Sequence, residues 1–266
     1  MTIFPGNRAD KAMETAKPVM LIVRPSGRAK DDVEVCRRAG WQAEVLSPIE
    51  IETDEASLKR LPEMYARADA VFWVSPAAVE TAVPYLNLSD GIKAHIAVGQ
   101  GSRRALARYA GAGVFAPEDG NDSEAVLRLP VWNSLPEGAR VLSVRGHGGR
   151  DFLMNALQEK GFRTEVAEVY FRRHKPLNFQ NFQTENIAAA YITSTELVQS
   201  LFAQLPPQFS RFFKSLLYFT HHPRIAEALK REGVCSVETV PTLEAALSYS
   251  SISVSDGMVF PGTSNQ

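Results

Sequence analysis

The sequence predicts an α/β protein of two doubly wound parallel-sheet lobes. Three observations support this fold class. The chain repeats itself, short apolar runs alternate with amphipathic stretches over its whole length, and its 266 residues suffice for two domains with separate cores.

The repeat is seen most clearly in two glycine-containing segments. VMLIVRPSG, which starts at Val19, returns as VLSVRGHGG, which starts at Val141, so that Arg24 and Arg145 lie 121 positions apart. Further matches follow in the same order: Gly40-Trp41 with Gly161-Phe162, Glu44-Val45 with Glu165-Val166, Val71 onward with Ala190 onward, and Ser123 onward with Leu243 onward. A tandem duplication is the simplest explanation.

The apolar runs have the character of buried strands. They are MLIV, AVFWV and HIAV in the first half and VLSV, AAYIT and LLYF in the second. Continuous apolarity without alternation is typical of parallel strands covered on both faces. The stretches between them have helical spacing, as in DDVEVCRRAG, where Gly40 after two arginines predicts a left-handed helix end.

Two longer and more polar segments occupy equivalent places in the repeat, EVLSPIEIE from Glu44 and EVAEVYFRR from Glu165. If they pair as an antiparallel ribbon, the first βα unit belongs with the C-terminal part and the middle of the chain forms the other lobe. If they do not, the chain forms two sequential domains with ordinary connecting loops. The residues alone leave both arrangements open.

Composition excludes several classes of function. With 45% hydrophobic and 22% charged residues and a net charge of -1, the chain has the profile of a soluble globular protein, and any acidic ligand must be recognised by local arginines or backbone donors. Cys36 and Cys235 form no CxxC pair, which is typical of a reduced, cytoplasmic protein without a disulfide framework. No apolar run approaches the ~20 residues of a membrane helix, and no basic run with aromatics suggests nucleic-acid binding.

An ordered series of motifs resembles the uroporphyrinogen-III synthases. No single motif is specific, but their order and spacing from Val19 to Leu247 are. The motifs are Val23-Arg24-Pro25, WVSPAAVE from Trp73, AVGQGSRRAL from Ala97, APEDGNDSEAVL from Ala116, RGHGGRDFL from Arg145 and VYFRRH from Val169.

The resemblance implies two lobes joined by a two-stranded antiparallel ribbon, with the active site in the interlobe cleft. It favours the ribbon arrangement, with these bounds: a flexible extension 1–17, lobe 1 at 18–46 plus 174–250, lobe 2 at 53–166, the ribbon at 47–52 and 167–173, and a flexible tail 251–266. It also implies the reaction, in which hydroxymethylbilane loses its hydroxyl and closes through a spiro intermediate with ring D inverted. The family uses no metal and no organic cofactor.

The resemblance implies one catalytic side chain, Tyr170, whose phenol would assist departure of the hydroxyl; the alternative is a packing tyrosine on a linker strand. The substrate is rich in carboxylates, and both arginines and the turns at strand ends can bind carboxylates. The alternative is that the turns are ordinary helix caps and that Arg145 pairs with Asp151. The expected substrate-binding residues are Arg24, Pro25, Ser75, Pro76, Ala77, Gly99, Gly101, Ser102, Arg145, Gly146, Gly149, Arg150, Thr193, Ser194, Thr195 and Arg224.

One turn departs from the family pattern. Family members often have small hydroxyl residues at the last strand-to-helix turn, where this chain has His221-His222-Pro223-Arg224. Arg224 could bind a carboxylate there, whereas neighbouring histidines without a third ligand predict no metal site. His95, His147 and His174 receive no role, and the turn at Gly146 lacks the nucleotide-binding glycine patterns.

The resemblance therefore implies a lyase acting on a linear tetrapyrrole, and the cysteine usage is typical of a cytoplasmic one. We expect a monomer that binds no nucleic acid and no membrane and makes a transient contact with the preceding enzyme of the pathway. The main alternative is a two-lobed binding or regulatory protein without turnover, because a fold does not fix a function.

Overall fold

The computed structural model describes residues 17–88, 93–110, 113–120 and 122–249. The chain divides into two compact units: unit 1 runs to Glu50 and resumes at His174, and unit 2 is Ile51–Arg173. Each unit is a sheet with helices, which confirms the predicted α/β fold class. The segments expected to be flexible, 1–17 and 251–266, lie outside the described residues except for Lys17.

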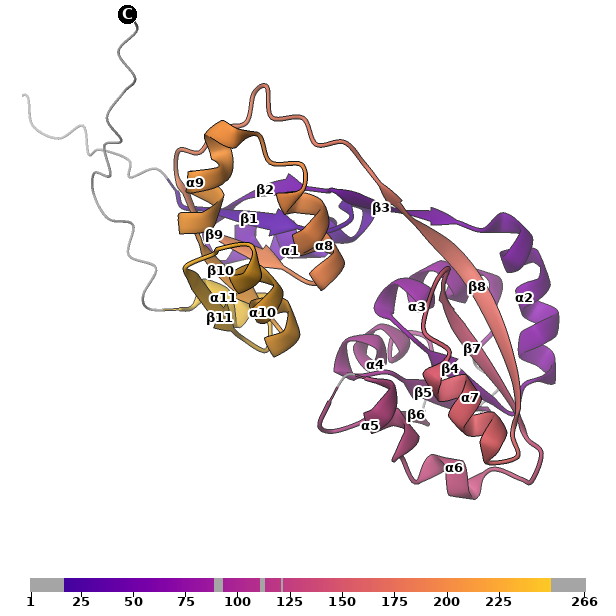
Figure 1. Cartoon of the computed structure of the whole chain (residues 1–266). Helices are drawn as coiled ribbons and strands as arrows, with labels where there is room; N and C mark the ends of the chain where they lie inside the picture. Colours follow the sequence, from indigo (N-terminus) through magenta and orange to yellow (C-terminus); the bar gives the residue numbers. More distant parts are fainter. Residues whose placement is uncertain (1–16, 89–92, 111–112, 121, 250–266) are drawn as a thin grey trace, which may run out of the picture. The chain divides into compact units, whose positions relative to one another are not determined.

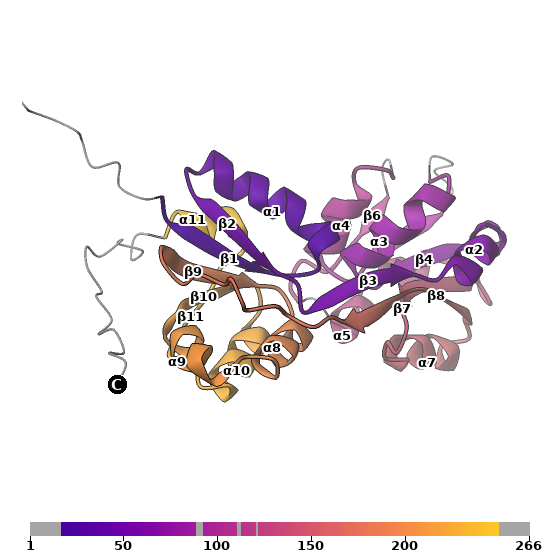
Figure 2. The ribbon, with the colours of Figure 1, turned by 90° about the horizontal axis from the view of Figure 1, so that it is seen from above.

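Unit 1 contains a parallel sheet of order β11-β10-β9-β1-β2. Its strands are β1 (Val19–Val23), β2 (Gln42–Leu46), β9 (Ile187–Ile192), β10 (Leu217–Thr220) and β11 (Ser236–Thr239). One face packs against α1 (Ser26–Arg38) and α11 (Leu243–Leu247), and the other against α8 (Thr195–Phe202), α9 (Pro207–Ser215) and α10 (Pro223–Arg231), as Figures 1 and 2 show.

Unit 2 contains a six-stranded sheet of order β3-β8-β7-β4-β5-β6. Its strands are β3 (Ile49–Thr53), β4 (Ala70–Trp73), β5 (Ala94–Ala97), β6 (Val114–Phe115), β7 (Arg140–Gly146) and β8 (Arg163–His174). One face is covered by α2 (Glu55–Arg67), α3 (Pro76–Ala82), the 3-10 turn η1 (Val83–Tyr85) and α4 (Gln100–Leu106), and the other by α5 (Ser123–Leu127), α6 (Val131–Ser134) and α7 (Phe152–Glu159).

The apolar runs are buried strands, as their composition predicts. All four residues of β4 are buried, as are the last six of β7 and the last four of β1. Gly40 has a left-handed φ of 82°, and Gly161, its equivalent in the repeat, has 90°. Both follow a helix, a place that favours glycine because a side chain would be strained there.

The ribbon is formed by β3 and the second half of β8. The Asp54 N–H donates to the Val169 carbonyl and the Lys175 N–H to the Pro48 carbonyl, each at 2.9 Å, so the two strands run antiparallel. The polar segment from Glu44 is not one strand, however. β2 ends at Leu46 and β3 begins at Ile49, because Pro48 has no N–H to offer a ladder.

Candidate functional site

Tyr170 lies where the ribbon enters the sheet of unit 2. It is paired in register with Gly146 at the end of β7 and is 1% exposed. A Cβ added to Gly146 would lie 2.5 Å from the phenol ring atoms Cε2 and Cζ, so only glycine allows the turn to approach the ring this closely.

The phenol oxygen has two polar neighbours. The Arg172 guanidinium donates to it at 2.8 Å, and Ser75 Oγ lies 3.1 Å away. Ser75 also caps α3, because its Oγ accepts from the Ala78 N–H at 3.0 Å. A guanidinium only donates, so the phenol accepts from Arg172 and keeps its own proton available for Ser75 or for a ligand.

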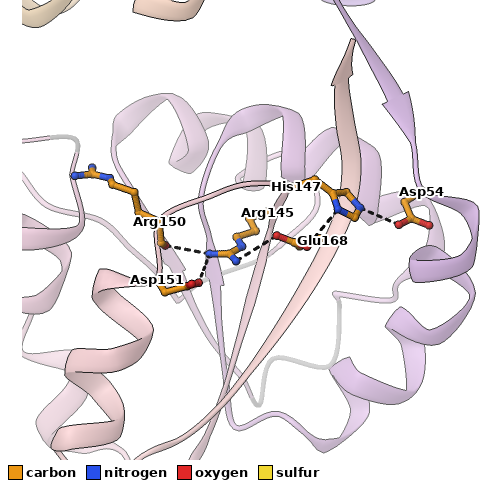
Figure 3. A network of polar contacts seen from close by, with 6 residues as sticks. All are labelled: Asp54, Arg145, His147, Arg150, Asp151 and Glu168. Atoms are coloured by element: carbon orange, nitrogen blue, oxygen red, sulfur yellow. Dashed lines mark hydrogen bonds and ion pairs between the residues drawn. The ribbon is translucent and has the colours of Figure 1, made fainter.

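Arg145 lies beneath the turn that follows β7. Its guanidinium donates to Asp151 Oδ1 at 2.7 Å and to the Arg150 carbonyl at 3.0 Å, and it pairs with Glu168 Oε1 at 3.2 Å (Figure 3). A Cβ at Gly149 would lie 2.9 Å from Arg145 Cδ, so the turn folds closely over this side chain. Arg145, only 8% exposed, thus holds the turn together, through the pairing with Asp151 that the sequence left open.

His147, to which the sequence assigned no role, extends this network. Its Nε2 is 2.9 Å from Asp54 Oδ2 and its Nδ1 is 3.2 Å from Glu168 Oε2 (Figure 3). The Ser57 N–H and then His147 lower the pKa of Asp54. Asp54 is 93 positions from His147, so spacing alone could not join them.

The four arginines expected to bind substrate fall into two classes. Arg145 is paired as above, and Arg24 pairs with Asp32 of α1. Burial raises the pKa of Asp32, and Arg24 only partly opposes this. Within the described residues, the Arg150 and Arg224 guanidinium groups have no ion-pair partner, and the Arg150 group points away from the network in Figure 3. These two are the arginines available to an anionic ligand.

The expected turns also divide between the units. In unit 2, Ser75-Pro76-Ala77 begins α3 beside Gly99-Gln100-Gly101-Ser102, since a Cβ at Gly101 would lie 3.5 Å from Pro76 Cγ. The Ser102 hydroxyl is buried and has no partner among the described residues.

In unit 1, Pro25 precedes α1 without a side-chain cap, and Ser194, between Thr193 and Thr195, caps α8 by accepting from the Leu197 N–H at 3.2 Å. The turn His221–Arg224, which differs from the family pattern, is capped as well, since His222 Nδ1 accepts from the Arg224 N–H at 3.1 Å. The expected residues thus form two sets at strand ends, one in each unit.

Two further properties concern the described part of the chain. No group of three or more His, Cys, Asp or Glu side chains there is placed to hold a metal ion. None of the helices described is both long enough and apolar enough to cross a membrane.

Comparison with solved structures supports the fold. Uroporphyrinogen-III synthetase from Helicobacter pylori 26695 superposes with a TM-score of 0.55 at 16% identity, over 87% of this chain and 97% of that one. A mutant uroporphyrinogen III synthase from the extremely thermophilic bacterium Thermus thermophilus gives a TM-score of 0.51 at 16% identity, over 86% and 96%. At such identities the likeness shows the fold alone.

Sequence comparison goes further. The chain is 27% identical over 198 residues to the uroporphyrinogen-III synthase of Escherichia coli K12, covering 70% of this chain and 80% of that protein. It is 30% identical over 207 residues to the enzyme of the same name from Salmonella typhimurium LT2, covering 72% and 81%. The family model described as uroporphyrinogen-III synthase HemD matches residues 30–248. The chain therefore belongs to the uroporphyrinogen-III synthase family.

Proposed function

We propose that this protein closes hydroxymethylbilane to uroporphyrinogen III, acting as a lyase that removes water and inverts ring D. The hydroxyl leaves with a proton as water, and the substituted carbon of ring D attacks the resulting azafulvene. The spiro intermediate then fragments and recloses. No step changes the net oxidation state, so the proposal needs no redox cofactor.

The observation that carries the proposal is the polar environment of the Tyr170 phenol. Arg172 occupies one side of the oxygen at 2.8 Å, which leaves the phenol proton for the departing hydroxyl. Arg172 is itself exposed, whereas Tyr170 is 1% exposed. A substrate carboxylate that attracts the Arg172 guanidinium would uncover the phenol, so substrate binding would prepare the proton donor.

Binding of the substrate would rely on unpaired guanidinium groups and on backbone donors. Arg150 and Arg224 supply the charges, because Arg24 and Arg145 already have carboxylate partners. Backbone N–H groups of the glycine and hydroxyl turns supply hydrogen bonds that need no particular side chain. The turns proposed to take part are Ser75–Ala77, Gly99–Ser102, Gly146–Gly149 and Thr193–Thr195. Two free cysteines, Cys36 and Cys235, are in keeping with a cytoplasmic location, where we propose the protein acts as a monomer.

Replacement of Tyr170 by phenylalanine tests this proposal. The variant keeps the ring against Gly146 and removes only the hydroxyl, so turnover of freshly prepared hydroxymethylbilane should fall by ~10–10³-fold. The free energy of unfolding should fall by about 1 kcal/mol, since Arg172 is exposed and can be solvated. Product would be separated into type I and type III isomers, with more type I expected from the variant because spontaneous closure then competes.

Tyr218→Phe is the matched control. The Tyr218 hydroxyl in unit 1 is also buried but has no hydrogen-bond partner among the described residues, so its removal should leave turnover and isomer ratio unchanged. Full activity in Tyr170→Phe would make Tyr170 a packing residue. Failure of the unmodified protein to raise the yield of type III above the spontaneous level would refute the proposed function itself.

A further inference from the structure

His147 is held on both ring nitrogens and on one ring face. Nε2 is 2.9 Å from Asp54 Oδ2, and Nδ1 is 3.2 Å from Glu168 Oε2. The ring stacks on Phe171 with centroids 3.8 Å apart and planes inclined by 11°. The side chain is partly buried, being 32% exposed, so its orientation is set by these three contacts.

The two carboxylates select one protonation state of this ring. A neutral imidazole carries a single N–H, so it could donate to one carboxylate and would turn a lone pair toward the other. An imidazolium satisfies both. It also completes a chain of alternating charge, in which Arg145 lies between Glu168 and Asp151. The contacts therefore favour the charged ring.

Other charged groups near the ring come from the elements packed around it. α2 contributes Arg60, Glu63 and Arg67, and β8 contributes Glu165, to the cavity of about 460 Å³ that His147 also lines. Arg67 pairs with both Glu63 and Glu165, so these charges largely compensate one another. Arg173 lies over the Phe171 ring at 4.5 Å. The carboxylates of Asp54 and Glu168 are the ones in contact with the imidazole.

The main chain of His147 connects this ring to Tyr170. The His147 N–H donates to the Tyr170 carbonyl at 2.9 Å, and the Asp54 N–H donates to the Val169 carbonyl at 2.9 Å. Gly146, the preceding residue, lies against the phenol. Main-chain hydrogen bonds thus connect both Asp54 and His147 directly to the part of β8 that carries Tyr170.

We propose that His147 is a positioning residue, whose imidazolium, held between Asp54 and Glu168, keeps the Gly146 turn against Tyr170 and so places the phenol. The proposal rests on the proposed function of Tyr170. It makes catalysis dependent on a proton that takes no part in the reaction. When the ring loses that proton, one carboxylate loses its partner and the turn loosens.

Asp54→Asn separates this role from a general structural one. Asp54 Oδ1 accepts from the Ser57 N–H at 3.0 Å and caps α2, which an asparagine oxygen also does. The asparagine N–H₂ then replaces Oδ2 and donates to Nε2 of a neutral ring, whose Nδ1–H still faces Glu168. Asp54→Asn therefore lets a neutral histidine make both contacts, whereas it places an N–H₂ donor against the Nε2–H of a charged one.

The experiment measures kcat and KM for hydroxymethylbilane from about pH 6 to about pH 8.5, across the range in which histidines titrate. The kcat of Asp54→Asn relative to the unmodified protein should rise about three- to tenfold with pH, the effect of one hydrogen bond. The ratio of KM values should change less, because Gly146–Gly149 is one of four turns proposed to bind the substrate. His147→Gln, which donates to one carboxylate at every pH, should show a rise of the same sign. Glu165→Gln, which alters the same cavity without contacting His147, should show a flat ratio.

Flat kcat ratios for both Asp54→Asn and His147→Gln would overturn the proposal. So would a loss confined to thermal stability, with kcat unchanged at a temperature where every variant is folded by circular dichroism. If the unmodified protein does not accelerate formation of the type III isomer, the proposed function fails together with this inference. If the unmodified protein is active but the kcat ratios of both variants are flat, this inference fails while the proposed function stands.

Discussion

Arg24 and Arg145 occupy the same position in the two halves of the repeat, yet they belong to different networks. Each follows a buried run of its strand, β1 or β7. Arg24 pairs with Asp32 on the following helix, in a site where both side chains are largely buried. Arg145 instead pairs with Asp151 of its turn and with Glu168 on the neighbouring strand, opposite it in register.

The contrast continues two residues later. At the position equivalent to His147, the first half has Ser26, whose Oγ donates to Glu50 Oε1 at 2.8 Å. A serine makes this contact at any pH above the titration of the glutamate, whereas a histidine makes its two contacts best when protonated. Both positions thus contact a carboxylate, but only unit 2 has a histidine there. The equivalent positions therefore make one carboxylate contact in the first half and two in the second.

The largest effect we predict distinguishes the two arginines. Arg24→Met leaves Asp32 without its partner, where the two side chains are 17% and 13% exposed, and should cost about 3 kcal/mol, the lower end of the range for buried pairs. Arg145→Met should cost less, about 1–2 kcal/mol, because Asp151 is 60% exposed and can be hydrated. Urea unfolding at neutral pH followed by circular dichroism measures both. A larger loss for Arg145→Met would reverse our account of the two networks.

The next prediction compares two glycines in these segments. Gly146→Ala would place a Cβ 2.5 Å from the Tyr170 ring and should destabilise the protein by about 1–3 kcal/mol. Gly27→Ala, in the first turn of α1, meets nothing within 4 Å and should stabilise it by about 0.5–1 kcal/mol. Thermal unfolding should shift in opposite directions. A neutral Gly146→Ala would mean that the turn does not press on the phenol.

The sequence predicted what depends on local pattern. Apolar runs identified the buried strands, and a glycine after two arginines identified the end of α1, because burial and backbone strain act over a few residues. The repeat further suggested the pairing of the two polar segments. The break at Pro48 was missed, although a proline within a polar strand is a signal for it.

The polar network could not be predicted in the same way. Arg145 was expected to face an anionic ligand because it follows a strand, whereas it lies within the end of β7 beside Glu168. That neighbour depends on the register of β7 with β8, and Asp54 reaches His147 through the ribbon. Spacing along the chain determines neither relation. A histidine between glycines, directly after a strand, was the one local sign that the turn is more than a connection.

The smallest predicted effect concerns acid stability, where a carboxylate of unit 1, Asp32, and one of unit 2, Asp54, should contribute with opposite signs. The pKa of Asp54 is lowered in the folded protein, first by the Ser57 N–H and then by His147. Its folded state binds the proton less readily than the unfolded chain, so the stabilisation is present above its ordinary pKa of about 4 and is lost as pH falls through the lowered value. The pKa of Asp32 is raised, chiefly by burial. Its folded state holds the proton more tightly, so this site gains stability as pH falls below the raised value.

Asparagine variants measure each contribution, because asparagine does not titrate. As pH is lowered from about 6 to about 3, the unmodified protein should lose stability relative to Asp54→Asn and gain stability relative to Asp32→Asn. Thermal unfolding at each pH gives both differences from the same set of samples. If both differences moved in the same direction, the two carboxylates would share one kind of environment and the contrast between these sites of unit 1 and unit 2 would be wrong. If only the stability difference for Asp54→Asn did not change with pH, the Ser57 N–H and His147 would not hold the Asp54 carboxylate. The imidazolium would then have only Glu168 as a carboxylate partner.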